Sequence, residues 1–262
     1  MECYSIASIN LSLDHSLTDS AWKQFESEVD RCPIDCHIEY IDRLMCRYGI
    51  EKCTLPPKYS VLLRNEKEVM VTTPDWARCM ILPVCESSQA AAFITQAFST
   101  HAVRRQMLQL HCATIDDDGR GILFLGPSGI GKTTQAERWA QYRGSAIING
   151  DIGFVQRTPA GYTAWGTPWH GSSPYCLNAS VPVKALVVLK QAPENALREL
   201  TGFEKVREVS SSVFYPTWLE NGMELCTDTL NHLLSDLPVY RLDNRADEEA
   251  VRLLAKEIDR IP

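Results

Sequence analysis

The residue types and spacing most suited to chemistry occur in Gly126-Pro127-Ser128-Gly129-Ile130-Gly131-Lys132-Thr133. This run matches the Walker A pattern, in which a glycine, any four residues, a second glycine, a lysine and a serine or threonine follow one another. Glycines let a backbone turn tightly, so that several N–H groups can point at one anion. We expect Lys132 to lie beside the β- and γ-phosphates of ATP and the Thr133 hydroxyl to bind Mg²⁺. With Thr134, these residues are the predicted nucleotide-binding set.

Two elements must position this loop. An apolar strand is predicted from Gly121 to Leu125 and a helix from about Thr133 to Tyr142. A phosphate-binding loop of this kind follows a strand and opens a helix, whose N-terminal N–H groups and dipole favour an anion. The flanking elements therefore support a nucleotide site at residues 126–134.

The metal also needs an acidic ligand besides the Thr133 hydroxyl, and Asp151 is the candidate. It follows the predicted strand from Ala146 to Ile148. A carboxylate at the C-terminal end of a strand faces the ligand crevice in sheets of this kind. We expect Asp151 to hold Mg²⁺, directly or through water, or to accept a proton from an attacking hydroxyl. The alternative is an ordinary turn residue after Asn149-Gly150.

Other nucleotide-dependent classes lack their motifs in this chain. It contains no Asn-Lys-x-Asp, which argues against a regulatory GTPase, and no Leu-Ser-Gly-Gly-Gln, which argues against a transporter ATPase. A kinase or a small ATP-dependent switch remains.

Several short segments together resemble a known family. They are Leu110-His111-Cys112-Ala113-Thr114-Ile115, Gly121-Ile122-Leu123-Phe124-Leu125 with the loop that follows, Ile148-Asn149-Gly150-Asp151 and, more weakly, Gly166-Thr167-Pro168-Trp169-His170-Gly171. These segments resemble the catalytic domain of HPr kinase/phosphorylase and its smaller relatives. The resemblance spans roughly residues 106–262, whereas the first hundred residues do not resemble the separate domain of the full-length enzyme.

The resemblance implies a fold and an activity. The fold would be mixed α/β, with a nucleotide-binding core like that of phosphoenolpyruvate carboxykinase. The activity would be transfer of the γ-phosphoryl group of ATP to a serine-type hydroxyl. The family's lysine, loop hydroxyl and upstream histidine carry over to Lys132, Thr133 and His111. Where the family commonly has two aspartates the chain has Gly150-Asp151, and the glycine-rich phosphorylase signature is not recognisable, which favours a kinase without the reverse reaction.

Two histidines are further candidates for the catalytic set, next to Lys132 and Asp151. A neutral imidazole can accept a hydroxyl proton near pH 7, and His170 lies in the predicted loop after Asp151. The alternative for His170 is a surface loop residue. For His111, in an apolar strand, the alternative to a place at the edge of the site is a hydrogen-bonded core histidine.

Residues 1–105 are predicted to form a small α+β unit that selects the substrate, before the catalytic domain at 106–262. Its expected strands are Tyr4 to Leu13, Cys79 to Val84 and a hairpin of Tyr59 to Leu63 with Val69 to Thr73; a helix is expected from about Gln89. The same unit contains a cluster of four cysteines and one histidine: Cys32, Cys36, His37, Cys46 and Cys53. Only the first cysteine pair has zinc-site spacing, so we expect buried thiols.

In the catalytic domain we expect strands from Leu108 to Ile115, Val183 to Leu189 and Val239 to Leu242, two helices between Pro193 and Ser210, and helices from Gly222 to Leu234 and Asp247 to Ile258.

Composition limits the partners. The 262 residues include 26 Lys and Arg against 33 Asp and Glu, a net charge of −7. This charge argues against a nucleic acid or an anionic membrane as a partner. Met1-Glu2-Cys3-Tyr4 has no signal-peptide pattern, so a cytoplasmic location is expected. The expected partners are ATP and a hydroxyl-bearing peptide, protein or small molecule, with a second copy of the chain as a further candidate. The alternatives to a kinase are a nucleotide-binding sensor or assembly module without transfer activity, and a phosphoserine phosphorylase or phosphatase.

Overall fold

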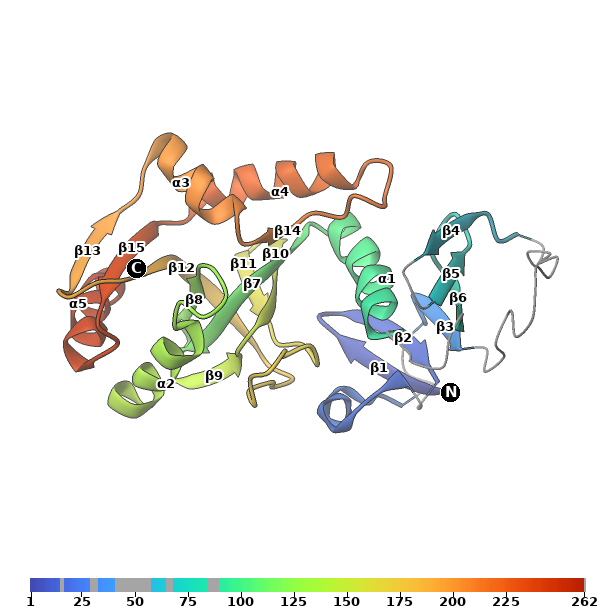
Figure 1. Ribbon diagram of the computed structural model, residues 1–262, viewed down its shortest axis with the longest axis horizontal. Coiled ribbons are helices and arrows are strands. Elements are labelled where there is room, and N and C mark those ends of the chain that lie inside the picture. Colours follow the sequence, from blue (N-terminus) through green and yellow to red (C-terminus); the bar gives the residue numbers. More distant parts are fainter. Residues whose placement is uncertain (15–16, 29–32, 41–57, 65–67, 84–89, 262) are drawn as a thin grey trace. The chain divides into compact units, whose positions relative to one another are not determined.

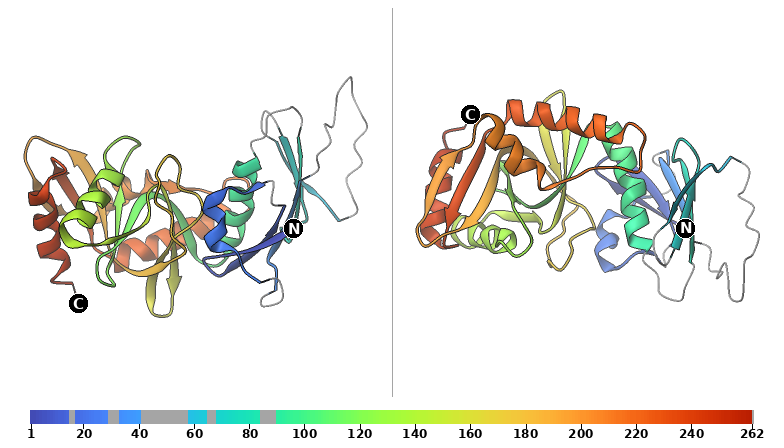
Figure 2. Two further views of the ribbon diagram at one scale, coloured as in Figure 1. Left: turned by 90° about the horizontal axis from the view of Figure 1, so that it is seen from below. Right: turned by 45° about the horizontal axis from the view of Figure 1, so that its top comes forward.

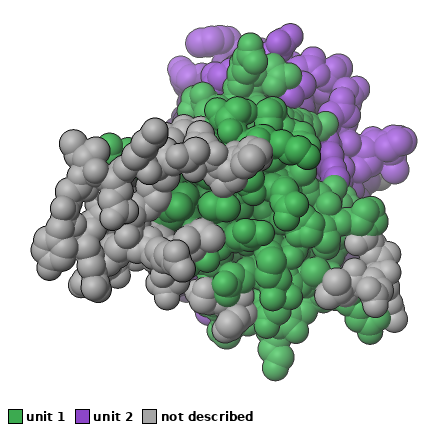
Figure 3. All heavy atoms as spheres, turned by 90° about the vertical axis from the view of Figure 1, so that its right-hand side faces the viewer, with its two compact units in different colours: residues 1–104, 216–222 green, residues 105–215, 223–262 purple. Residues whose placement is uncertain are grey.

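The computed structural model of the chain describes residues 1–14, 17–28, 33–40, 58–64, 68–83 and 90–261. Two compact units are present (Figure 3): Met1–Arg104 with Pro216–Gly222, and Arg105–Tyr215 with Met223–Pro262. Pro216–Gly222 is thus grouped with the first unit, where Trp218 Nε1 donates to Thr100 Oγ1 at 2.9 Å. Among the described residues, no helix combines the length and the apolar character needed to cross a membrane.

The first unit is an α+β arrangement in which one mixed sheet packs against a helix (Figure 1). Its described strands follow the spatial order β1 (Glu2–Ile6), β2 (Ile9–Leu13), β3 (Cys36–Tyr40), β6 (Arg78–Pro83), β5 (Glu68–Thr72) and β4 (Val61–Arg64). A short 3₁₀ helix, η2 (Ser20–Phe25), packs against β1, and α1 (Ala90–Arg104) packs against β2, β3 and β6. Apolar residues of α1 at helical spacing, among them Phe93, Ala97 and Phe98, are buried, which is the pattern of a helix covering a sheet.

The predictions for this unit are partly confirmed. The segment from Tyr4 to Leu13 is two antiparallel strands joined at Ala7 and Ser8, which both have positive φ. The predicted hairpin is present as β4 and β5, although its turn at residues 65–67 lies outside the described residues. Of the cysteine cluster, Cys32, Cys46 and Cys53 lie outside the described residues. Cys36 is buried with its Sγ 3.7 Å from that of Cys79; the hydrogen bond with Cys79 and burial hold the pKa of Cys36 well above its usual value, which favours a protonated thiol.

A nine-stranded mixed sheet is the centre of the second unit, residues 105–215 and 223–261 (Figure 1). Its main path is β11 (Gly161–Trp165), β10 (Ile152–Thr158), β7 (Met107–Asp116), β8 (Gly121–Leu125), β12 (Ser180–Gln191), β15 (Val239–Asn244) and β13 (Ala196–Glu199). Two further strands, β9 (Ala146–Asn149) and β14 (Val213–Phe214), pair with β7 outside this path. β12 runs parallel to both β8 and β15, and its central residues 185–189 are all buried, as expected for a strand covered on both faces.

Four helices accompany this sheet: α2 (Lys132–Arg143), α3 (Gly202–Ser210), α4 (Gly222–Asp236) and α5 (Glu248–Ile258). α2 and α5 pack against each other and against the sheet (Figure 2). Alternate residues of β7, β8 and β12 form one core with the buried faces of these two helices; it includes Ala113, Ile115, Phe124, Val187 and Trp139. This core fixes α2 over the sheet and therefore fixes the position of its N-terminus.

The mixed α/β class is confirmed, one local prediction is wrong and one hairpin was not predicted. Only one helix, α3, lies between Pro193 and Ser210; the other predicted helix is the edge strand β13. Leu197 and Arg198 pair with Leu242 and Arg241 of β15, because tertiary pairing outweighs the weak helix propensity of a four-residue segment. The antiparallel hairpin of β10 and β11 has no counterpart in the prediction.

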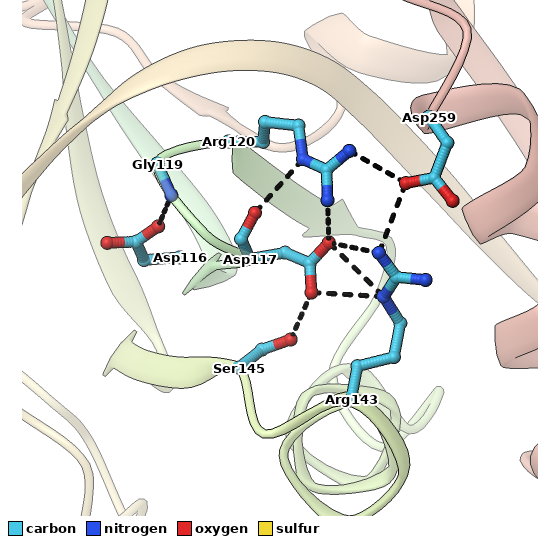
Figure 4. A network of polar contacts seen from close by, with 7 residues as sticks. All are labelled: Asp116, Asp117, Gly119, Arg120, Arg143, Ser145 and Asp259. Carbon is cyan, nitrogen blue, oxygen red and sulfur yellow. Dashed lines mark hydrogen bonds and ion pairs between the residues drawn. The ribbon is translucent and has the colours of Figure 1, made fainter.

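An ion-pair network connects three segments at the end of β7 (Figure 4). The Asp117 carboxylate, only 3% exposed, accepts from Arg120 at 2.9 Å, Arg143 at 2.9 Å and Ser145 at 2.7 Å. Both arginines also pair with Asp259, directly after α5. Burial alone would raise the pKa of Asp117, but hydrogen bonds from Arg143 and Ser145 and the charges of both arginines outweigh it and hold the pKa below its usual value. The network thereby ties the β7–β8 turn to the C-terminal ends of α2 and α5.

Replacing Asp117 by Asn should lower the free energy of unfolding by about 3 kcal/mol at pH 7, because Arg120 and Arg143 lose a buried charged partner. A carboxyl group with a lowered folded-state pKa stabilises the fold above its unfolded-state pKa of about 3.9, and this contribution is lost as the pH falls through the folded-state value. Urea denaturation of both proteins from pH 7 to pH 3 should therefore show a difference that shrinks below about pH 4. Asp118→Asn, at an exposed position in the same turn, is the control; an equal effect there would contradict the assignment.

Candidate functional site

The candidate site lies around the middle of β7, which pairs with β8 on one edge and with β9 and β10 on the other. β8 and β9 both run antiparallel to β7, so they run in the same direction and end at the same side of the sheet. The last residue of β8, Leu125, pairs with Cys112, and the last residue of β9, Asn149, pairs with Thr114. The segments that follow these two strands therefore begin only two residues apart along β7. This register brings the predicted phosphate loop and Asp151 together.

The loop of residues 126–131 joins β8 to α2, as the sequence predicts. Gly131 is the residue before α2 and has φ of +106°, a conformation that side chains other than glycine rarely adopt. The first N–H groups of a helix have no intrahelical partners, so the N-terminus of α2 presents donors at this point. The loop and the helix thus form a backbone environment suited to an anion.

Lys132 is the first residue of α2 and is 6% exposed. Its Nζ donates to the carbonyl oxygens of Gly126 at 3.0 Å and Pro127 at 3.2 Å, which folds the side chain back over the loop. Burial lowers the pKa of Lys132, and the nearby Asp151 carboxylate partly offsets this effect. The Thr133 hydroxyl donates to the carbonyl of Gly150 at 3.2 Å, which connects the start of α2 to the turn after β9.

His111 and Asp151 form a close pair beside the loop. His111 Nε2 lies 3.1 Å from Asp151 Oδ1, and both side chains are about 30% exposed. His111 lies on the same face of β7 as Ala113 and Ile115, which pack under α2, because alternate residues of a strand share a face. Burial and the charge of Lys132 lower the pKa of His111 and outweigh the opposite effect of Asp151, so the imidazole is neutral at pH 7.

Asn149 is a positioning residue that the sequence pattern did not reveal. Its side chain is fully buried, and its Oδ1 accepts from the backbone N–H groups of Asp151 and Ile152, both at 2.9 Å. Its Nδ2 donates to the carbonyl oxygens of Thr167 at 3.0 Å and Trp169 at 3.1 Å. The only signal in the sequence was Asn149-Gly150, which is equally typical of an ordinary turn.

The 166–171 loop, held by Asn149, passes directly over Asp151. A Cβ built on Gly171 would lie 2.8 Å from Asp151 Cγ, so the backbone at this point contacts the carboxylate. His170 points elsewhere in the same loop: its Nδ1 contacts the carbonyl oxygen of Ser173. Trp169 packs against Phe154, with ring centroids 6.1 Å apart.

These segments line an open cavity of about 360 Å³. Its lining residues are His111, Ser128, Gly129, Gly131, Lys132, Thr133, Thr134, Gly150, Asp151, Ser172, Ser173 and Pro174. Most predicted site residues are thus brought to one cavity, whereas Gly126, Pro127, Ile130 and His170 do not line it. Gly150 and residues 172–174 were not predicted.

The donors in this cavity fit a magnesium nucleotide. Mg²⁺ prefers oxygen ligands and commonly takes only one or two carboxylates, with substrate phosphates and water completing its shell. The Thr133 hydroxyl and the Asp151 carboxylate are such oxygens, and the buried Lys132 ammonium suits a phosphate. Among the described residues, no group of three or more His, Cys, Asp or Glu side chains is arranged so that it could hold a metal ion.

Comparisons with known proteins yield one family. The sequence model of a family described as "SynChlorMet cassette protein ScmC" matches residues 78–233, more than half of the chain. No curated protein matches. Among solved structures, "Structure of the Hpr(Ser) kinase/phosphatase from Coxiella burnetii" matches with a TM-score of 0.35 and 11% sequence identity, over 57% of this chain and 94% of that chain.

Replacing Asn149 by Ala should destabilise the fold and release the segments that Asn149 joins. Unpaired buried donors and acceptors cost about 1–3 kcal/mol each, so we expect a loss of about 3 kcal/mol in the free energy of unfolding. Hydrogen exchange should become faster at the amides of Asp151 and Ile152 and across the 166–171 loop. Asn231→Ala, at an exposed position on α4, should leave both measurements unchanged. Unaltered exchange in Asn149→Ala would contradict the positioning role.

Proposed function

The chain belongs to the family described as SynChlorMet cassette protein ScmC, and we propose that it is an ATP- and Mg²⁺-dependent kinase that phosphorylates a serine-type hydroxyl of a peptide, small protein or metabolite. The observation that carries this proposal is the buried Lys132 at the head of α2, in one cavity with Thr133, Asp151 and His111. In this proposal residues 126–134 are a Walker A loop on a phosphoenolpyruvate carboxykinase-like core, and the first unit selects the substrate.

Each side chain has a role in binding. Lys132 exchanges the carbonyls of Gly126 and Pro127 for oxygens of the β- and γ-phosphates, and the N-terminal amides of α2 bind the same group. Thr133 and Asp151 hold Mg²⁺, which when bound neutralises charge on the β- and γ-phosphates. Positioning and charge stabilisation supply most of the catalysis in phosphoryl transfer.

The proton of the acceptor goes to His111 in this proposal. The acceptor oxygen forms a new bond to the γ-phosphorus, the bond from that phosphorus to the bridging oxygen of ADP breaks, and the hydroxyl proton moves to the neutral imidazole. Asp151 Oδ1, 3.1 Å from His111 Nε2, orients the ring and stabilises the imidazolium that forms. His111 lines the cavity and His170 does not, which favours His111 as the base.

The proposal is tested first at Lys132. Incubation with γ-labelled ATP, Mg²⁺ and a panel of serine-containing peptides, small proteins and free serine should label an acceptor. In Lys132→Ala we expect ATP affinity to fall at least 100-fold and labelling to disappear, because the cation at the phosphates is lost. Lys256→Ala, at an exposed position on α5, is the control. Labelling that survives in Lys132→Ala would refute the proposed mechanism, and Lys132-dependent ATP binding without any labelled acceptor would favour a nucleotide-binding module.

A second test concerns the proton acceptor. The rate should require neutral His111, so kcat/KM, which reports the ionisation of the free enzyme, should fall as the pH drops through a pKa below the usual histidine value of about 6.5. His111→Asn should lower kcat about 100- to 1,000-fold and remove this acid limb, while ATP affinity changes little. His232→Asn, on the exposed face of α4, should keep the wild-type profile. An intact acid limb in His111→Asn would mean that another group, such as Asp151 or His170, accepts the proton.

A further inference from the structure

Ser173 occupies the space that a side chain at position 150 would need. A Cβ built on Gly150 would overlap Ser173 Oγ and would lie 2.5 Å from Ser173 Cβ. Gly150 does not have a positive φ, so its backbone conformation is open to any residue. Space rather than conformation therefore excludes a side chain there, and Ser173 is what fills the space.

The Ser173 hydroxyl is held in place by its own loop. Ser173 is 8% exposed, its N–H donates to the carbonyl of His170 at 3.0 Å, and its carbonyl oxygen contacts His170 Nδ1. Gly150 N–H donates to the carbonyl of Tyr175 at 3.2 Å, which fixes the two segments side by side. His170 therefore has a structural role in this arrangement, because it braces the backbone that carries Ser173.

The hydroxyl proton of Ser173 remains available for a hydrogen bond to a ligand. Its Oγ accepts from the N–H of Tyr175 at 3.3 Å, and within the described residues the hydroxyl proton has no acceptor. Ser173 lines the cavity together with Lys132, Thr133 and Asp151. Thr133 bonds to the carbonyl of the same Gly150 over which Ser173 lies, so the two hydroxyls flank one residue. An O–H group held here is suited to an anionic oxygen, because hydrogen bonds to charged acceptors are the strong ones.

We propose that Ser173 is a further phosphate-binding residue. Its hydroxyl, which fills the space beside Gly150, donates a hydrogen bond to an oxygen of the phosphoryl group held by Lys132 and the loop. This inference rests on the proposed nucleotide site. It names a ligand contact from a segment outside the Walker A pattern, on a loop that Asn149 ties to the site.

Variants that move the hydroxyl from position 173 to position 150 test this proposal. Ser173→Ala should weaken ATP and inorganic phosphate binding about 10- to 100-fold, the effect of one hydrogen bond to a charged group. Gly150→Ser alone should lower the melting temperature and abolish binding, because it clashes with Ser173. Gly150→Ser combined with Ser173→Gly returns a hydroxyl to the same space and should regain ATP affinity to within about fivefold of the wild type. The matched control, Gly150→Ala with Ser173→Gly, fills the space without a hydroxyl and should stay as weak as Ser173→Ala.

The outcomes separate this inference from the proposed function. If the wild type does not bind ATP, or Lys132→Ala binds it equally well, the nucleotide site itself is refuted. If binding depends on Lys132 but Ser173→Ala binds both ligands within twofold of the wild type, only the Ser173 inference is overturned. It is also overturned if both double variants recover equally, since packing alone would then explain Ser173. Mass spectrometry after incubation with ATP and Mg²⁺ should find Ser173 unmodified, and a phosphate on its Oγ would make it an acceptor instead.

Discussion

The buried side-chain amide of Asn149 holds together the two segments on which the candidate site depends. Its oxygen accepts from Asp151 and Ile152, and its nitrogen donates to Thr167 and Trp169. Because one planar group makes both sets of bonds, the turn that carries Asp151 and the loop that carries Gly171 cannot move independently. The contacts at Gly171 and Ser173 are consequences of this link. A rigid support of this kind is what a site for phosphoryl transfer needs, since small displacements of reacting groups cost much of the rate.

β7 supplies the other half of the support. Its first residues pair with β10 and its last residues pair with β8 and β9, so the neighbours of β7 change near the middle of the strand. His111 lies at that point, just beyond the residues that pack under α2. The ion pairs of Asp117 with Arg120 and Arg143 fix the opposite end of β7 to the end of α2. Contacts with β7 and the turn that follows it therefore position both ends of α2, the helix that carries Lys132.

The elements next to the loop could be predicted because their signals are local: an apolar run, a glycine-rich turn and a helical period. The contacts of the site could not, because they depend on pairing between distant segments. The proximity of His111 and Asp151 requires β9 and β10 to pair with the same edge of β7, and the β10–β11 hairpin carries polar residues such as Gln156 and Arg157 that weaken its pattern. Asn149 and Ser173 were missed for the same reason: each acts through residues about 20 positions away, with no spacing rule to reveal it.

The chain is acidic overall, and the cavity itself is close to balanced in charge. It contains one lysine ammonium, one aspartate carboxylate and an imidazole that is neutral at pH 7. A nucleotide triphosphate would therefore meet no excess of positive charge, and Asp151 would repel it. In the proposed function this balance makes the divalent cation necessary for tight binding, because Asp151 attracts the phosphates only through a cation held between them. In the same proposal Lys132 adds selectivity for an anion, because the loss of two neutral carbonyl acceptors is offset only by charged oxygens, which form the stronger hydrogen bonds. A neutral ligand of the same size would not release the lysine from its own loop.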